Sequence, residues 1–186
     1  MAIQSWQKLR SRYRRLLTIF LFLALGLTAT AIGVLTPMSY QEAVDRSSDL
    51  NQTRQNIQEM DLLSGAATIF SNNFLICLIM FIPFFGLAIG FYILYNTGLY
   101  ISAESSLSNV SPILTFLTLI IFPFAWLEFI TYSTAFAENV WLPWRLIKYR
   151  DLSELVKAGM LILIVAGILF LAAIIEMAVI LSFSAS

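Results

Sequence analysis

The chain has 186 residues, of which 59% are hydrophobic and 12% charged, and its 11 basic and 11 acidic side chains cancel. Ordinary globular domains carry about 25% charged residues, and a water-soluble fold of this size could not cover so much apolar surface, so the composition indicates an integral membrane protein. The zero net charge offers no electrostatic basis for a nucleic-acid partner. The sequence has no histidine and one cysteine, Cys77, so it lacks the usual ligands of zinc, haem and iron–sulfur centres and the Ser-His and Cys-His catalytic pairs. We therefore expect no metal, no cofactor and no enzyme activity.

The first third of the chain divides into a basic, an apolar and a polar segment. Residues 1–15 carry five Lys or Arg side chains and are expected in the cytoplasm. Residues 16–38 are predicted to form an uncleaved anchor helix, because the apolar run is longer than the usual 7–15-residue core of a signal peptide. Residues 39–65 are predicted to form an external polar loop, part of it helical along the surface.

Residues 66–103 form an uncharged run with a proline near its middle. A straight helix of that length would measure roughly 55 Å, against roughly 30 Å of hydrocarbon. Pro83 has no backbone N–H to donate and favours a break. The run therefore predicts two short spans broken at Pro83, with a re-entrant pair as the alternative.

The last part of the chain is predicted to contain two more spans, residues 112–137 and residues 158–183. Residues 138–157 between them are expected to form a cytoplasmic interfacial segment with a short surface helix, because aromatic and basic residues occur together there. We take its interface anchors to be Trp141, Trp144 and Arg145.

The positive-inside rule then selects the topology. Residues 1–15 and 138–157 belong inside, which requires an even number of crossings by residues 66–103. The sequence therefore predicts an all-α, multi-pass helical bundle in the cell membrane. It has about five transmembrane helices, a cytoplasmic amino terminus and an external carboxyl terminus.

Five short motifs occur in a characteristic order. They are residues 69–73 (Ile-Phe-Ser-Asn-Asn), 86–90 (Gly-Leu-Ala-Ile-Gly), 96–98 (Asn-Thr-Gly), 123–128 (Pro-Phe-Ala-Trp-Leu-Glu) and 172–176 (Ala-Ala-Ile-Ile-Glu). In this order they resemble the stage II sporulation protein M family of polytopic membrane proteins. Phe124 and Ala125 replace the His and Gly of that family's Pro-His-Gly-x-x-Glu element, so any role that needs the imidazole is lost. The resemblance implies an all-helical bundle of about five spans that serves as a subunit of a membrane complex. The family's namesake acts in a complex that recruits a peptidoglycan-cleaving enzyme.

Glu128 and Glu176 are the two acidic residues inside predicted spans. An ionised side chain there costs about 2.5–3.5 kcal/mol on insertion scales, so it usually faces a partner or a cavity. No Lys or Arg lies in a predicted span to pair with them. Three states remain open: protonated carboxyls, carboxylates hydrogen-bonded to polar side chains, and carboxylates paired with a base on another subunit. These acids are therefore either a structural bond between helices or part of a proton or cation relay.

The remaining polar and small residues in the spans are expected to serve helix contacts. Asn72, Asn73 and Asn96 are candidate donors to the glutamates or to backbone groups freed at the helix break. Gly86 and Gly90 form a GxxxG pair that permits close helix packing, either within this bundle or in a dimer.

Two functions are open to such a chain. The first is a non-catalytic integral membrane subunit that scaffolds, stabilises or assembles a larger complex, which includes a metal- or redox-enzyme complex whose active site lies on other chains. Its partners would be other membrane protein subunits and lipids. The alternative is a small transporter or channel that uses Glu128 and Glu176.

Overall fold

The computed structural model describes residues 2–150 and 152–184, with side chains for 13–48, 55–148, 150 and 152–183. The described residues form helices and no strand, so the predicted all-α class is confirmed. The helices are α1 (Ala2–Leu35), α2 (Tyr40–Gln58), α3 (Leu62–Phe81), α4 (Phe85–Leu107), α5 (Pro112–Ile121), α6 (Pro123–Tyr149) and α7 (Ser153–Ser184).

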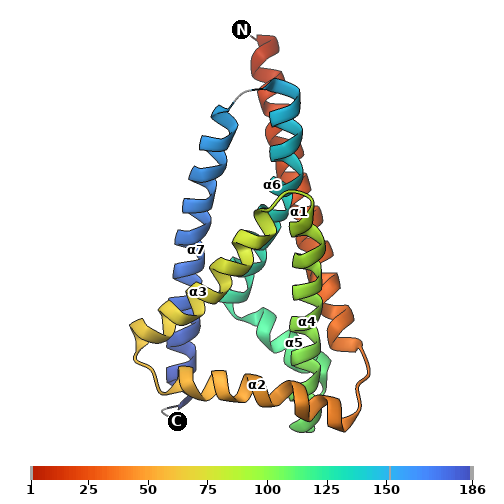
Figure 1. Ribbon diagram of the computed structural model, residues 1–186, viewed down its shortest axis with the longest axis vertical. Helices are drawn as coiled ribbons and strands as arrows, with labels where there is room; N and C mark the ends of the chain where they lie inside the picture. The colour runs from red at the N-terminus through yellow and green to blue at the C-terminus, as the bar shows by residue number, and fades with distance from the viewer. Residues whose placement is uncertain (1, 151, 185–186) are drawn as a thin grey trace.

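Helices α1, α6 and α7 run along the length of the molecule, and α3 and α4 meet in a turn partway along it (Figure 1). The amino terminus, the end of α6 and the start of α7 lie at one end, while α2 crosses the other end near the carboxyl terminus. Four segments are long and apolar enough to cross a membrane, and α5 with α6 makes a fifth if that bent pair is one span. The four are Tyr13–Leu35, Leu62–Phe81, Phe85–Leu107 and Ser153–Phe183.

The first helix is longer than predicted at its start and shorter at its end. It runs without interruption from Ala2 to Leu35, so the basic segment 1–15 and the anchor 16–38 belong to one helix that stops three residues early. Met1 lies outside the described residues, and so do the side chains of residues 2–12.

The predicted loop 39–65 is mostly helix, because two side chains cap the helices it contains. Ser39 and Glu42 form a reciprocal capping box at the start of α2, in which the Ser39 N–H donates to the Glu42 carboxylate at 2.8 Å. The bond from the Ser39 backbone, followed by that from the Ser39 hydroxyl, holds the pKa of Glu42 below its ordinary value. Asp61 accepts from the N–H groups of Leu63 and Ser64 and so starts α3.

Helices α3 and α4 meet in a tight turn around Pro83. Helix α3 ends at Phe81 and α4 begins at Phe85. Phe84 has φ 67° and ψ −47°, and the Phe85 N–H donates to the Pro83 carbonyl at 2.8 Å, so the chain makes a γ-turn there. The uncharged run 66–103 thus forms two helices that meet at Pro83 rather than one long helix.

The span predicted for residues 112–137 is not one continuous helix. The chain bends by 87° between α5 and α6. Pro123 disfavours helical backbone at the preceding residue, and Phe122 is extended, with φ −76° and ψ 136°. Helix α5 has ten residues, about 15 Å, which is too short to cross a bilayer.

The separate surface helix predicted within residues 138–157 is also wrong. Helix α6 continues through Pro143 to Tyr149, and Arg150 ends it in a left-handed conformation with φ 49°. The polar side chains of this stretch remain in the bundle because they pair with one another, as described below. Asp151, within the predicted segment, lies outside the described residues.

Helix α6 lies at the centre of the bundle, where it contacts α1, α3 and α7. Its Tyr132 and Phe136 join a buried apolar core that also contains Cys77, Met80 and Leu169. A second close contact joins α1 to α4. There a Cβ on Gly33 would fall 2.1 Å from the Tyr95 carbonyl oxygen, and a Cβ on Gly98 would fall 2.1 Å from the Thr30 carbonyl oxygen.

Candidate functional site

Two polar clusters occupy the two halves of α6. The first surrounds Glu128 near the start of the helix, and the second surrounds Glu138, about 15 Å further along the axis. Both draw side chains from neighbouring helices, so each links α6 to the rest of the bundle.

The first cluster joins α3, α6 and α7 through Glu128. The Asn73 amide donates to Glu128 Oε1 at 2.6 Å. The Glu176 carboxyl on α7 lies next to the Glu128 carboxyl. Tyr132, one turn beyond Glu128, is buried beside it.

The three asparagines have different surroundings. Asn73 reaches Glu128, as the sequence allows. Asn72 is exposed and donates to Asn73 Oδ1 at 3.4 Å. Asn96 donates to the Tyr92 carbonyl of its own helix at 2.8 Å. Among the described bonds, Asn73 alone of the three candidate donors reaches a glutamate.

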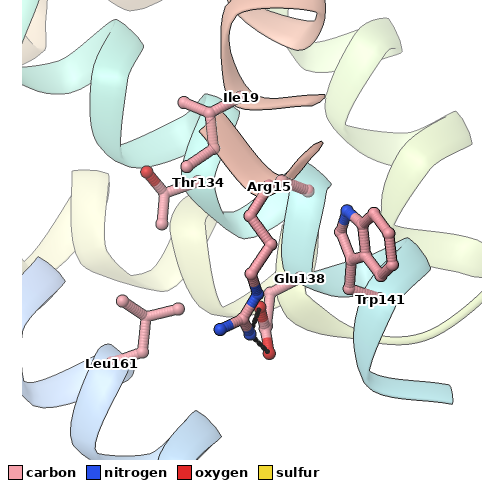
Figure 2. Close-up of a pocket in the computed structure, with 7 residues that line it drawn as sticks. Arg15, Ile19, Thr134, Glu138, Trp141 and Leu161 are labelled. Atoms are coloured by element: carbon pink, nitrogen blue, oxygen red, sulfur yellow. Dashed lines mark hydrogen bonds and ion pairs between the residues drawn. The ribbon is translucent and has the colours of Figure 1, made fainter. Parts of the chain in front are cut away.

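The second cluster is a chain of ion pairs across α1, α6 and α7. Arg15 Nη2 donates to both carboxylate oxygens of Glu138, at 3.0 and 2.9 Å. Glu138 also accepts from Arg145, one α6 residue pairing with another two turns away. Arg145 Nη1 reaches Glu154 Oε2 on α7 at 2.5 Å, and Lys157 reaches Glu154 Oε1 at 2.5 Å. Figure 2 shows Arg15 extended toward the Glu138 carboxylate, with Trp141 to one side and Leu161 to the other.

The residues in the middle of this series of ion pairs are buried. Glu138, Arg145 and Glu154 are exposed to 4%, 8% and 8%. Arg145, predicted to be an interface anchor, is buried, because two carboxylates hold its guanidinium inside the bundle. Basic residues do occur in the spanning helices, since Arg15 lies within Tyr13–Leu35, but this one pairs with Glu138 and leaves Glu128 to Asn73 and Glu176.

The two tryptophans lie at the edge of the second cluster. Trp141 donates from Nε1 to the Thr18 hydroxyl at 3.1 Å, which ties α6 to α1. Trp144 is exposed, packs edge-on against Trp141 and lies under the Lys148 ammonium, 4.4 Å from the ring centroid.

Asn139 caps the turn between α3 and α4 from the side. Its amide donates to the Met80 carbonyl at 3.0 Å and to the Ile82 carbonyl, both at the end of α3. A Cβ on Gly86 would fall 2.6 Å from the Asn139 amide nitrogen, and a Cβ on Gly90 would fall 2.4 Å from the Phe136 ring. The GxxxG pair thus packs against α6 of its own chain.

The sequence reasoning missed Arg15, Glu138, Asn139 and Glu154 as interacting residues. A signal was present, because Glu138 and Arg145 are seven residues apart and so share a helix face. Ending the span at Ala137 placed Glu138 in water instead. Among the described residues no group of three His, Cys, Asp or Glu side chains could hold a metal ion.

Comparison with family models, with curated proteins and with solved structures finds no match to this chain.

Proposed function

We propose that this chain is a non-catalytic integral membrane subunit that scaffolds or assembles a larger membrane protein complex. The observation that carries the proposal is α5, a short apolar helix that this chain leaves uncovered. None of its ten residues, all of them described, is buried. Four of its large apolar side chains are exposed by about half or more: Ile113, Leu114, Leu117 and Ile121.

Helix α5 fits neither of the usual positions of a lone helix at a membrane. It is too short to span the hydrocarbon. A helix that lies in the membrane interface needs a strongly polar or charged face. The only polar side chains of α5 are two threonines, and it has no charged residue. One of these threonines, Thr115, already bonds to Ser105 of α4. The bend at Phe122 also leaves irregular backbone, which is tolerated at membrane depth where protein covers it. A partner subunit packed on α5 would satisfy all three conditions.

The rest of the bundle suits a rigid support. The charges in the second cluster pair within the chain, so the bundle holds α1, α6 and α7 together without a partner's help. The resemblance to the stage II sporulation protein M family points to the same role. The partners would be other membrane subunits, including those of a metal- or redox-enzyme complex with its active site elsewhere.

We also propose an orientation in the cell membrane. Arg14, Lys148 and Arg150 are exposed near the amino-terminal end of the bundle, whereas the other end carries acidic residues such as Glu42 and Asp61. By the positive-inside rule the amino terminus would be cytoplasmic and the carboxyl terminus external.

Site-specific photo-crosslinking in native membranes tests the proposed partner surface. A photoreactive amino acid replaces Leu117 on α5, and a matched variant carries it at Leu163, an equally apolar and 73% exposed position on α7. We expect discrete adducts with other proteins at position 117, and lipid adducts alone at position 163. Lipid adducts alone at both positions would contradict the proposal.

One observation favours a second candidate function, a small proton or cation transporter. Carboxyl groups from α6 and α7 meet beside Asn73 of α3, which brings three helices to one polar point. Glu128→Gln and Glu176→Gln variants in liposomes separate the two functions. If the chain is a transporter, the native protein conducts ions and both variants lose that flux. If it is a scaffold, neither the native protein nor either variant conducts ions.

A further inference from the structure

An open groove between α1 and α6 lies beside the charged cluster. It has a volume of about 210 Å³ and is lined by Arg14, Val140, Trp141 and Trp144. A second cavity of about 120 Å³, lined in part by Trp141, contains the Arg15–Glu138 pair. We propose that the groove binds the headgroup of an anionic phospholipid, with its phosphate at Arg14.

The charge balance at the groove favours an anion. The neighbouring carboxylate, Glu138, is already shared by Arg15 and Arg145. Arg14 is exposed, and among the described side chains it makes no ion pair. The Lys148 ammonium lies over the ring of Trp144, one of the residues that line the groove. A phosphate at this point would meet a guanidinium, which binds phosphate oxygens in a bidentate manner.

The surface next to the groove fits acyl chains rather than water. Leu17 and Leu21 follow Arg14 by three and seven residues, so they lie on the same face of α1. They are 67% and 57% exposed, and Val140 on α6 is 45% exposed. An amphiphile with its phosphate at Arg14 would therefore lay its tails along apolar side chains of both helices. A soluble phosphate compound would leave that surface unused.

The two tryptophans place the groove at headgroup depth. Indole rings concentrate where hydrocarbon meets headgroups, and here Trp141 and Trp144 form one wall, edge to face with ring centroids 5.4 Å apart. Basic pockets between membrane helices are known as headgroup sites for anionic lipids. A compact anionic headgroup such as phosphoglycerol suits the small groove.

Native mass spectrometry of the purified full chain tests the site. The protein in mild detergent receives equimolar phosphatidylglycerol and phosphatidylcholine with identical acyl chains. The variants are Arg14→Gln and, as the matched control, Arg150→Gln, which removes an exposed positive charge outside the groove. Melting temperatures in the same detergent check that both variants remain folded.

We expect the native protein and Arg150→Gln to retain phosphatidylglycerol in preference to phosphatidylcholine. In Arg14→Gln we expect the ratio of bound phosphatidylglycerol to bound phosphatidylcholine to be about fivefold lower, which is the effect typical of one basic residue at a membrane surface. Equal retention of the two lipids by the native protein would overturn the proposal. Equal losses in the two variants would overturn it as well, because they would indicate diffuse attraction rather than a site. A folded Arg14→Gln protein with the full preference would be a third contradiction.

Discussion

Arg15 of α1 donates from one guanidinium nitrogen to both carboxylate oxygens of Glu138 on α6, at 3.0 and 2.9 Å, across 123 residues of sequence. The pair joins α1 to α6 near the amino-terminal end of the bundle. Arg145 pairs with Glu138 and with Glu154, and so extends the series of ion pairs to α7. One line of alternating charges thus joins α6 and α7, which are consecutive in sequence, to the distant α1.

Glu138 is the residue on which this line depends. Glu138→Gln leaves the buried Arg145 with one carboxylate in place of two and removes the anion opposite Arg15. Breaking a buried ion pair typically costs about 3–5 kcal/mol, so we expect a clearly lower melting temperature in detergent. Glu59→Gln, at an exposed acidic residue, is the control and should melt like the native protein. Identical melting of the two variants would show that the ion pairs do not stabilise the bundle.

Asn139 is predicted to hold the turn between α3 and α4. Asn139→Ala removes both donors to the carbonyls of Met80 and Ile82. A buried polar group left without its partner costs about 1–3 kcal/mol. Hydrogen exchange should therefore accelerate at residues 80–86 before it does in α7. Unchanged exchange at the turn would mean that the Asn139 bonds do not stabilise it.

Alanine substitutions at Gly33 and Gly167 are predicted to change the melting temperature in opposite directions. Gly33→Ala places a methyl group against the Tyr95 carbonyl at 2.1 Å, so α1 and α4 must separate. Overpacking of this kind costs about 1–3 kcal/mol.

Gly167→Ala is the control for that change. No described atom lies within 4 Å of a Cβ at Gly167 in α7, and alanine in a helix interior is favoured over glycine by about 0.5–1 kcal/mol. We therefore expect Gly33→Ala to lower the melting temperature and Gly167→Ala to raise it. The same sign for both would contradict the close α1–α4 contact.

The start of α3 should respond to acid. Hydrogen bonds from Ser64, first from its backbone and then from its side chain, with a further one from the Leu63 backbone, hold the pKa of Asp61 below its ordinary value. The ionised Asp61 cap therefore stabilises the start of α3 fully at pH values above the ordinary carboxyl pKa. This stabilisation is lost as the pH falls through the lowered pKa.

The protection factors of the Leu63 and Ser64 amides, taken relative to their intrinsic exchange rates at each pH, should therefore fall at acidic pH in the native protein. Asp61→Asn, whose amide oxygen still accepts but does not titrate, should remove that pH dependence. A native profile that is flat with pH, or unchanged by Asp61→Asn, would contradict the cap.

The sequence predicts the apolar helices well and their polar contacts less well. The helix class, the candidate spans on either side of Pro83 and the anchor helix follow from uncharged runs long enough to cross a bilayer. The bend at Phe122 is not predicted, because a single span over residues 112–137 takes Pro123 as an interior residue. Pro123 is in fact the first residue of a new helix, α6. The position of that proline could have indicated the boundary.

The polar contacts needed the fold itself. Asn73 and Glu128 are 55 residues apart, and only the packing of α3 on α6 brings them to 2.6 Å. The sequence predicts Arg145 to be an interface anchor because two tryptophans precede it, whereas in the fold its side chain is buried between the carboxylates of Glu138 and Glu154. Residue type predicts that Glu128 needs a partner and offers Asn72, Asn73 and Asn96 as candidates, but only the fold selects Asn73.

The most direct test of the scaffold role is purification at native expression level in mild detergent, with quantitative mass spectrometry of the proteins that remain bound. The account predicts a defined set of membrane proteins in fixed ratio to this chain, lost when Leu117 on α5 is replaced by arginine and retained when Leu163 on α7 is replaced in the same way. A chain that elutes alone or as a homo-oligomer, with no co-purifying protein in fixed ratio, would contradict the central claim.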